Sequence, residues 1–101
     1  MDAKLITCIV EKGKAEGIIA EVLHKGAQAA TYFDAKGRGV REKIGVSGMF
    51  IKEEKEVIFI VAKNDQADEV FDTVVSMGGL KEKGMGFAFI QQVENAIGFL
   101  D

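Results

Sequence analysis

The chain lacks proline and tryptophan altogether, and it has only one cysteine, one histidine and one tyrosine. A single cysteine, Cys8, excludes a disulfide within the chain and is typical of a reducing compartment. A single histidine, His24, leaves no second histidine with which to build a metal or catalytic site. Without proline, turns must rely on glycine, of which there are 12.

Long apolar runs are also missing. No run approaches the length of a membrane span, and no segment near the start resembles a signal peptide. We therefore expect a cytoplasmic protein. The 101 residues predict one domain over 1–101, and the net charge of -3 argues against nucleic acid as a partner.

Short runs of β-branched and aromatic residues predict four strands, at 5–10, 30–35, 57–62 and 87–90. Apolar residues at helical spacing predict a helix over about 15–25, with Gly26 placed to end it. A second helix is predicted to begin with Asn64 or Asp65 as its N-cap and to end at Gly78 and Gly79. Cys8 is predicted to be a small core residue within the first strand.

This order, β-α-β, long loop, β-α-β, predicts an α+β fold with a ferredoxin-like split β-α-β repeat. Its sheet would be antiparallel with four strands, and both helices would cover one face. Phe59, Phe87 and Phe89 are expected either on the opposite face or in the core. An apolar face left uncovered predicts self-association around a symmetry axis.

The segment from Lys36 to Glu54 is rich in glycine and cations and too poor in apolar residues to bury a face. Long loops in small domains are usually functional. Backbone amides of Gly37 and Gly39, with Arg38 and Arg41, can form an anion site. The alternative is a solvated loop whose charges only keep it soluble.

A second cationic turn contains Lys81, Lys83, Gly84 and Gly86. It can complete the anion site, or it can be an ordinary helix-to-strand connection in which the glycines serve turn geometry. At the far end of the long loop, the cluster Met49-Phe50-Ile51 is a candidate docking tip for a partner. Alternatively, these residues fold back onto the assembly or start the third strand early.

Glu53, Glu54 and Glu56 alternate with lysines before the third strand. We expect them to form a solvated stem at the base of the loop. A paired-carboxylate active site would need burial and a cleft, which the sequence does not indicate.

The chain as a whole resembles the P-II family of trimeric nitrogen-regulatory signalling proteins and their P-II-like relatives. The resemblance rests on Lys-Leu-Ile-Thr-Cys-Ile-Val near the start and on Val-Glu-Asn-Ala-Ile near the end. Lys36-Gly37-Arg38-Gly39 is similar to the opening of the family's T-loop, and Gly84-Met85-Gly86 to its B-loop. Ala29-Ala30-Thr31 stands where the family has a small residue, a larger one and a threonine near the bound adenine.

The resemblance implies a regulator without enzymatic activity: a homotrimer that binds a small anionic effector, an adenine nucleotide such as AMP, ADP or ATP, between subunits. The T-loop-like insertion covers about 37–54 and would regulate a target protein, for example a membrane transporter or a protein of nitrogen metabolism. The implied ligand-binding residues are Ala30, Thr31, Gly37, Arg38, Gly39, Arg41, Lys83, Gly84, Met85 and Gly86. The implied partner-binding residues are Lys43, Met49, Phe50 and Ile51.

The chain also departs from the family pattern. Phe87 stands where the B-loop has a phosphate-contacting lysine, and Gly98 and Leu100 stand where the family has two arginines. The loss of the lysine at Phe87 favours a weaker or smaller ligand, such as a nucleoside monophosphate or diphosphate. The loop lacks the tyrosine that is uridylylated in enteric members, since Tyr32 falls in a predicted strand.

Two further hypotheses remain beside the nucleotide sensor. The missing phosphate-contacting side chains favour a trimer whose loop binds a protein partner without any ligand. An enzyme on this scaffold ranks well below both, since no nucleophile-base pair, metal set or acid pair is apparent.

Overall fold

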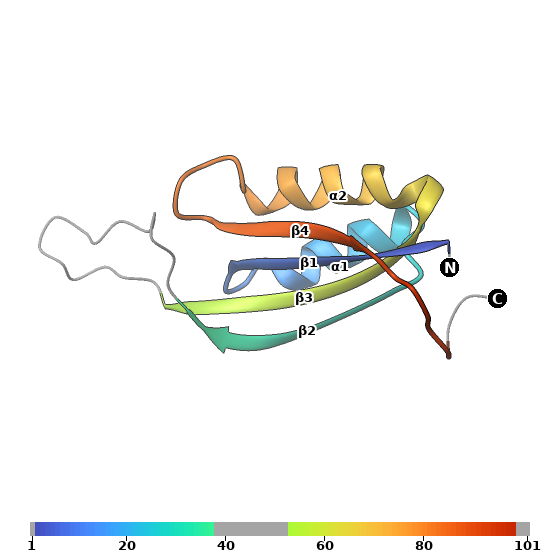
Figure 1. Cartoon of the computed structure of the whole chain (residues 1–101). Coiled ribbons are helices and arrows are strands. Elements are labelled where there is room, and N and C mark those ends of the chain that lie inside the picture. The colour runs from blue at the N-terminus through green and yellow to red at the C-terminus, as the bar shows by residue number, and fades with distance from the viewer. Residues whose placement is uncertain (1, 38–52, 99–101) are drawn as a thin grey trace, which may run out of the picture.

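The computed structural model describes residues 2–37 and 53–98. Its elements follow one another as β-α-β-β-α-β (Figure 1). They are β1 Ala3–Glu11, α1 Ala15–His24, β2 Ala29–Lys36, β3 Glu54–Lys63, α2 Asn64–Gly78 and β4 Gly86–Gln92. All six predicted elements are present, and each strand extends beyond its apolar centre because hydrogen bonding to a neighbour continues past the buried residues.

The strands form one antiparallel sheet in the order β2-β3-β1-β4. The two apolar strands lie at the centre, where Ile6 of β1 pairs with Ile60 of β3 and with Ile90 of β4. Each β-α-β unit therefore carries its second strand past the centre to an outer edge. The predicted ferredoxin-like topology is confirmed.

Both helices pack on one face of the sheet. Apolar side chains at even-numbered positions of β1 and β3, such as Ile6, Cys8 and Ile58, are fully buried against Ile18 of α1 and Val74 of α2. Successive side chains of a strand point to opposite faces of the sheet, so the even-numbered positions of β1 and β3 face the helices and form the core. Burial raises the pKa of the Cys8 thiol to about 12, which agrees with the predicted role of a small core residue.

Glycines end both helices as predicted. Gly26 has φ +103° after α1 and Gly79 has φ +66° after α2, both in a region that other residues rarely adopt. The predicted N-cap of α2 is wrong: Lys63 occupies that position without a side-chain hydrogen bond, and Asn64 is already helical. The backbone N–H of Asn64 instead donates to the carbonyl of Asp2, because β3 runs directly into the helix beside the start of β1.

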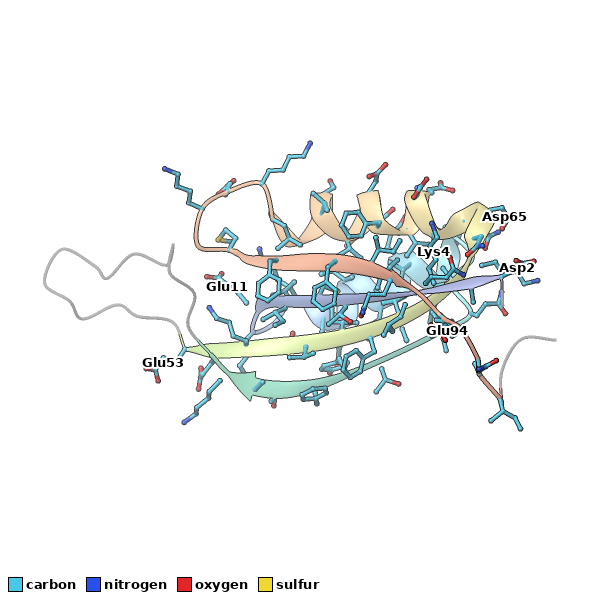
Figure 2. The ribbon with its side chains drawn as sticks, in the orientation of Figure 1. Asp2, Lys4, Glu11, Glu53, Asp65 and Glu94 are labelled. Carbon is cyan, nitrogen blue, oxygen red and sulfur yellow. The ribbon has the colours of Figure 1, made fainter. Side chains whose placement is uncertain are left out.

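The other face of the sheet is open and aromatic. Phe33, Phe59, Phe87 and Phe89 project from it, and each of these residues is between 40% and 54% exposed. Figure 2 looks onto this face. Phe33 lies 5.8 Å from Phe59, and Phe87 lies 6.2 Å from Phe89, measured between ring centroids. Of the two alternatives predicted for Phe59, Phe87 and Phe89, the structure therefore shows the open face and not the core.

No helix within residues 2–37 and 53–98 is long and apolar enough to cross a bilayer.

Candidate functional site

The base of the long loop is a regular antiparallel stem. Lys36 of β2 pairs with Glu54 of β3, and the backbone N–H of Gly37 donates to the carbonyl of Glu53 at 2.9 Å. The hydrogen bonds thus continue to the last residues that the structure describes on either side. Seven predicted site residues lie outside the described residues: Arg38, Gly39, Arg41, Lys43, Met49, Phe50 and Ile51. Their roles stay predictions.

Two predicted ligand residues, Ala30 and Thr31, lie near the start of β2. Ala30 packs against the core on the helix side, whereas Thr31 is exposed on the open face beside Phe59. Gly37 lies beyond the other end of the same strand, roughly 20 Å away at the usual rise per residue. One copy of the chain therefore does not bring Thr31 and Gly37 together.

The second cationic turn connects α2 to β4. The N–H of Glu82 donates to Gly79 at 3.0 Å, and the N–H of Met85 donates to Glu82 at 3.4 Å, with Gly84 at φ +80°. A closing hydrogen bond with positive φ at the third residue is typical of a type II turn. The turn presents the side chains of Lys81 and Lys83 to solvent.

Gly86 has a structural reason to be glycine, apart from any ligand. Its φ is +120°, and a Cβ placed there would lie 2.0 Å from the carbonyl oxygen of Ile9. No other residue fits this approach between β4 and β1 without moving backbone. The close approach of β4 to β1 thus accounts for a glycine at position 86, and a role of Gly86 in ligand binding stays a prediction.

The stem and the turn lie at the same end of the sheet, but β2 of the stem and β4 after the turn are the two opposite edge strands (Figure 1). Gly86 of β4 pairs with Val10, Val10 pairs with Glu56, and Glu56 pairs with Asp34 of β2. These pairings place β2 and β4 about 14 Å apart, which is three interstrand spacings. In Figure 2, Glu11 and Glu53 mark this end and Asp2 and Asp65 mark the other.

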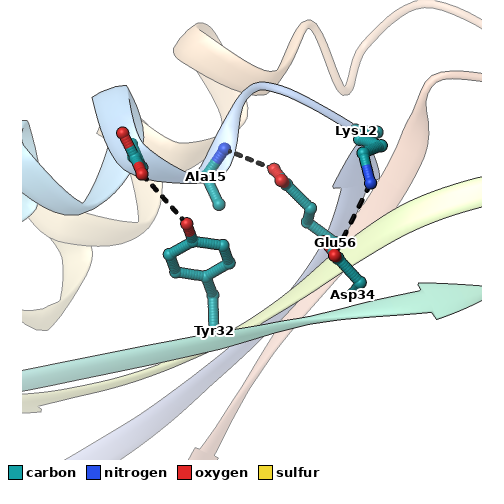
Figure 3. A network of polar contacts seen from close by, with 6 residues as sticks. Lys12, Ala15, Tyr32, Asp34 and Glu56 are labelled. Carbon is teal, nitrogen blue, oxygen red and sulfur yellow. Dashed lines mark hydrogen bonds and ion pairs between the residues drawn. The ribbon is translucent and has the colours of Figure 1, made fainter.

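A polar network connects the stem to the start of α1 (Figure 3). The carboxylate of Glu56 accepts a hydrogen bond from the N–H of Ala15 at 2.8 Å, and Glu56 is only 7% exposed. The expectation that Glu56 belongs to a solvated stem is wrong, because it has the same parity as Ile58 and so points to the helix side. The two-residue spacing between Glu56 and the apolar Ile58 is the sequence signal that could have predicted the burial of Glu56.

Tyr32 and Asp34 of β2 complete the network. The Tyr32 hydroxyl donates to the carboxylate of Glu16 at 3.1 Å, and Lys12 forms an ion pair with Asp34 at 3.5 Å. The hydrogen bond to Glu16 and the negative charge of that carboxylate raise the pKa of Tyr32. As predicted, Tyr32 lies in a strand and not in the loop.

The start of α1 also contacts the second turn. The Lys14 ammonium donates to the carbonyl oxygen of Gly78, the last residue of α2, at 3.1 Å. A Cβ placed on Gly79 would lie 3.7 Å from Lys14 Nζ and 3.8 Å from the terminal methyl of Met85. Lys14 thus lies against the residues at which the turn begins, a contact that no pattern in the sequence indicates.

The outer surface of the helices carries an open groove of about 330 Å³ between α1 and α2. It is lined by Glu21, Lys25, Glu69, Asp72, Thr73, Ser76 and Met77. None of these residues belongs to the predicted ligand site. In the described part of the chain, no group of three or more His, Cys, Asp or Glu residues is placed to hold a metal ion.

Comparison with known sequences identifies relatives over almost the whole chain. The profile of the family described as nitrogen regulatory protein P-II matches residues 3–99. A nitrogen fixation nifHD region GlnB-like protein 1 of Methanothermococcus thermolithotrophicus is 31% identical over 92% of this chain and 90% of its own length. The protein of the same description from Methanococcus maripaludis is 27% identical over the same shares.

Two solved structures share the fold. PII of Arabidopsis thaliana bound to citrate matches with a TM-score of 0.67 at 24% identity, over 91% of this chain and 78% of that one. The GlnK–ATP complex of B. subtilis matches with a TM-score of 0.71 at 19% identity, over 94% and 87%.

Proposed function

The chain belongs to the nitrogen regulatory P-II family, and from this premise we propose that it is a trimeric sensor of an adenine nucleotide. In this proposal the nucleotide binds in clefts between subunits and changes how the segment 37–54 engages a target protein. The observation that carries the proposal is that the stem and the turn lie at one end of the sheet, with β2 of the stem and β4 after the turn on opposite edges.

That position supports a ligand site made by two copies of the chain. A nucleotide at the turn of Lys83 and Gly84 would be about 14 Å from β2 of the same copy. A second copy that brings its own β2 edge to the turn would close this distance. Gly37, beyond the end of β2 of one subunit, would then meet Lys83, Gly84 and their neighbours of the next, whereas Thr31 would lie roughly 20 Å back along the same strand.

The open aromatic face supports self-association. Phe33, Phe59, Phe87 and Phe89 present four half-exposed rings on the sheet side that carries no helix. Contiguous apolar patches of this kind mark interaction sites in soluble proteins. A trimer that turns this face inward leaves both helices outside and keeps the loop stem accessible at one end.

The ligand is proposed to be a nucleoside monophosphate or diphosphate. The B. subtilis GlnK structure is an ATP complex, so the fold holds an adenine nucleotide in that protein. Here Lys81 and Lys83 supply cations at the turn, whereas Phe87, where the family has lysine, is 54% exposed and stacks on Phe89. One phosphate-contacting cation fewer favours a ligand with fewer phosphates.

The proposed output is protein binding through the segment that contains Lys43 and Met49-Phe50-Ile51. A membrane transporter or a protein of nitrogen metabolism is the proposed target. The curated relatives are described by a nitrogen fixation gene region, which supports the second class. The proposed location is the cytoplasm, and no catalytic activity is proposed.

A thermal-shift screen against AMP, ADP, ATP, cyclic AMP and 2-oxoglutarate, with and without Mg²⁺, tests the ligand. A ligand at 100 times its Kd adds about 2.7 kcal/mol of stability, which is a shift of several degrees for a domain of this size. The shift should disappear in Lys83→Ala and in Arg38→Ala. The absence of any shift at millimolar nucleotide would refute the sensor.

The second candidate is a trimer whose loop binds its target without a ligand. The phenylalanine at position 87 favours it, because a phosphate contact is lost there. Target binding that is equal with and without nucleotide would support this alternative. Binding that requires nucleotide would exclude it.

A further inference from the structure

The C-terminus of α2 faces the cationic turn that is proposed to bind an anion. α2 ends at Gly78, directly before the turn, and its last turn contains no basic residue. The aligned peptide dipoles leave about half a negative charge on the final carbonyls of a helix. By itself, this end of α2 would repel an anion at Lys83 and Gly84.

Lys14 places a positive charge at this end from another part of the chain. Its Nζ donates to the Gly78 carbonyl at 3.1 Å across 64 positions of sequence. The backbone of Lys14 is held at both sides, since its N–H donates to Glu11 at 3.3 Å and its carbonyl accepts from the N–H of Ile18 at 3.2 Å. The side chain is half-buried, so the ammonium is held near one place.

Lys14 also lies next to the residues that shape the turn. Its ammonium and the Met85 methyl both approach Gly79, at 3.7 and 3.8 Å from the position of an added Cβ. By contrast, Lys12 of the same connection points to β2, where it pairs with Asp34. Two lysines two positions apart therefore have different partners.

We propose that Lys14 sets the preference of the turn for anionic ligands by neutralising the C-terminal charge of α2. This inference rests on the proposed function, because it assumes an anion at the turn. In this inference Lys14 need not touch the ligand, and its effect on affinity grows with the charge of the ligand.

The test compares Lys14→Met, Lys14→Arg and the control Lys12→Met by isothermal titration with AMP and ATP. Lys14→Met should weaken AMP binding roughly two- to fivefold, the size of a helix-terminus charge effect, and should weaken ATP binding more. Lys14→Arg should restore both affinities because the guanidinium keeps the charge. Lys12→Met, whose partner lies on β2, should change either affinity by less than Lys14→Met does.

An equal loss for AMP and ATP in Lys14→Met would overturn the inference, since it would indicate a merely structural role. Unchanged affinities would overturn it as well. If the wild type binds no nucleotide, the proposed function fails, and titration with inorganic pyrophosphate decides the inference separately. Pyrophosphate binding that weakens in Lys14→Met and recovers in Lys14→Arg would support it, and a wild type that does not bind pyrophosphate would overturn it.

Discussion

The Glu56 carboxylate accepts a hydrogen bond from the backbone N–H of Ala15 at 2.8 Å, across 41 positions of sequence. Ala15 is the first residue of α1, whose N-cap, Lys14, makes no side-chain capping bond. A strand residue therefore does what a capping side chain usually does: it satisfies an N–H that the helix leaves unpaired and places negative charge at the positive end of the dipole.

Replacing Glu56 with alanine should destabilise the fold by about 1–3 kcal/mol, because a buried N–H loses a charged acceptor. Glu56→Gln should cost less, since the amide oxygen can still accept. Urea denaturation measures both changes. Glu54→Ala at an exposed stem position is the control and should stay within about 0.5 kcal/mol; an equal loss in Glu54→Ala would show that the cap does not matter.

Gly86→Ala should destabilise the protein by more than about 2 kcal/mol, because the new Cβ would meet the Ile9 carbonyl at 2.0 Å. Gly13→Ala is the control, because it introduces the backbone strain of a positive φ without a steric clash. Gly13 has φ +100° but nothing within 4 Å of an added Cβ, so its substitution should cost about 1–2 kcal/mol. Equal losses at the two positions in thermal or urea unfolding would contradict the close approach of β4 to β1.

Phe59→Glu should convert the proposed trimer into a folded monomer. It places a charge at the centre of the open aromatic face, where desolvation on association would be unfavourable. Light scattering after size-exclusion chromatography gives the mass, and circular dichroism checks the fold. Leu23→Glu is the matched control, because Leu23 is 46% exposed on the helix side. A trimer in Phe59→Glu, or a monomer in Leu23→Glu, would place the interface elsewhere.

Tyr32 should titrate above its ordinary pKa of 10.0, because its hydroxyl donates to Glu16 and phenolate formation beside that carboxylate is unfavourable. The chain has one tyrosine and no tryptophan, so ultraviolet absorbance near 295 nm follows Tyr32 alone. Glu16→Gln should lower the pKa toward 10.0, whereas Glu21→Gln should leave it unchanged.

The sign of the linked stability follows from the raised pKa. Between the unfolded pKa and the higher folded pKa, the native state holds more protons than the unfolded state. The contribution of the Tyr32–Glu16 contact is therefore complete below pH 10 and declines as the pH rises through the folded pKa. Stability that increases with pH in this window, relative to Glu16→Gln, would be the opposite of this expectation.

The sequence by itself determined the element order and the fold class. The β-branched runs at Leu5–Val10 and Val57–Ala62 predicted strands, and periodicity assigned the helix that follows each of them. Gly26 and Gly79 marked the helix ends because positive φ selects glycine. The local preference for strand or helix and the pattern of buried apolar residues therefore predicted the same elements over most of the chain.

Only the tertiary structure decided the roles of Glu56, Gly86 and Lys14. Their partners, Ala15, Ile9 and Gly78, are all distant in sequence. A local sequence pattern does not predict a contact between adjacent strands or between the ends of two helices. The same holds for the two parts of the candidate site. Their place on opposite edges depends on the strand order β2-β3-β1-β4, which arises when each β-α-β unit packs its second strand beside the other unit.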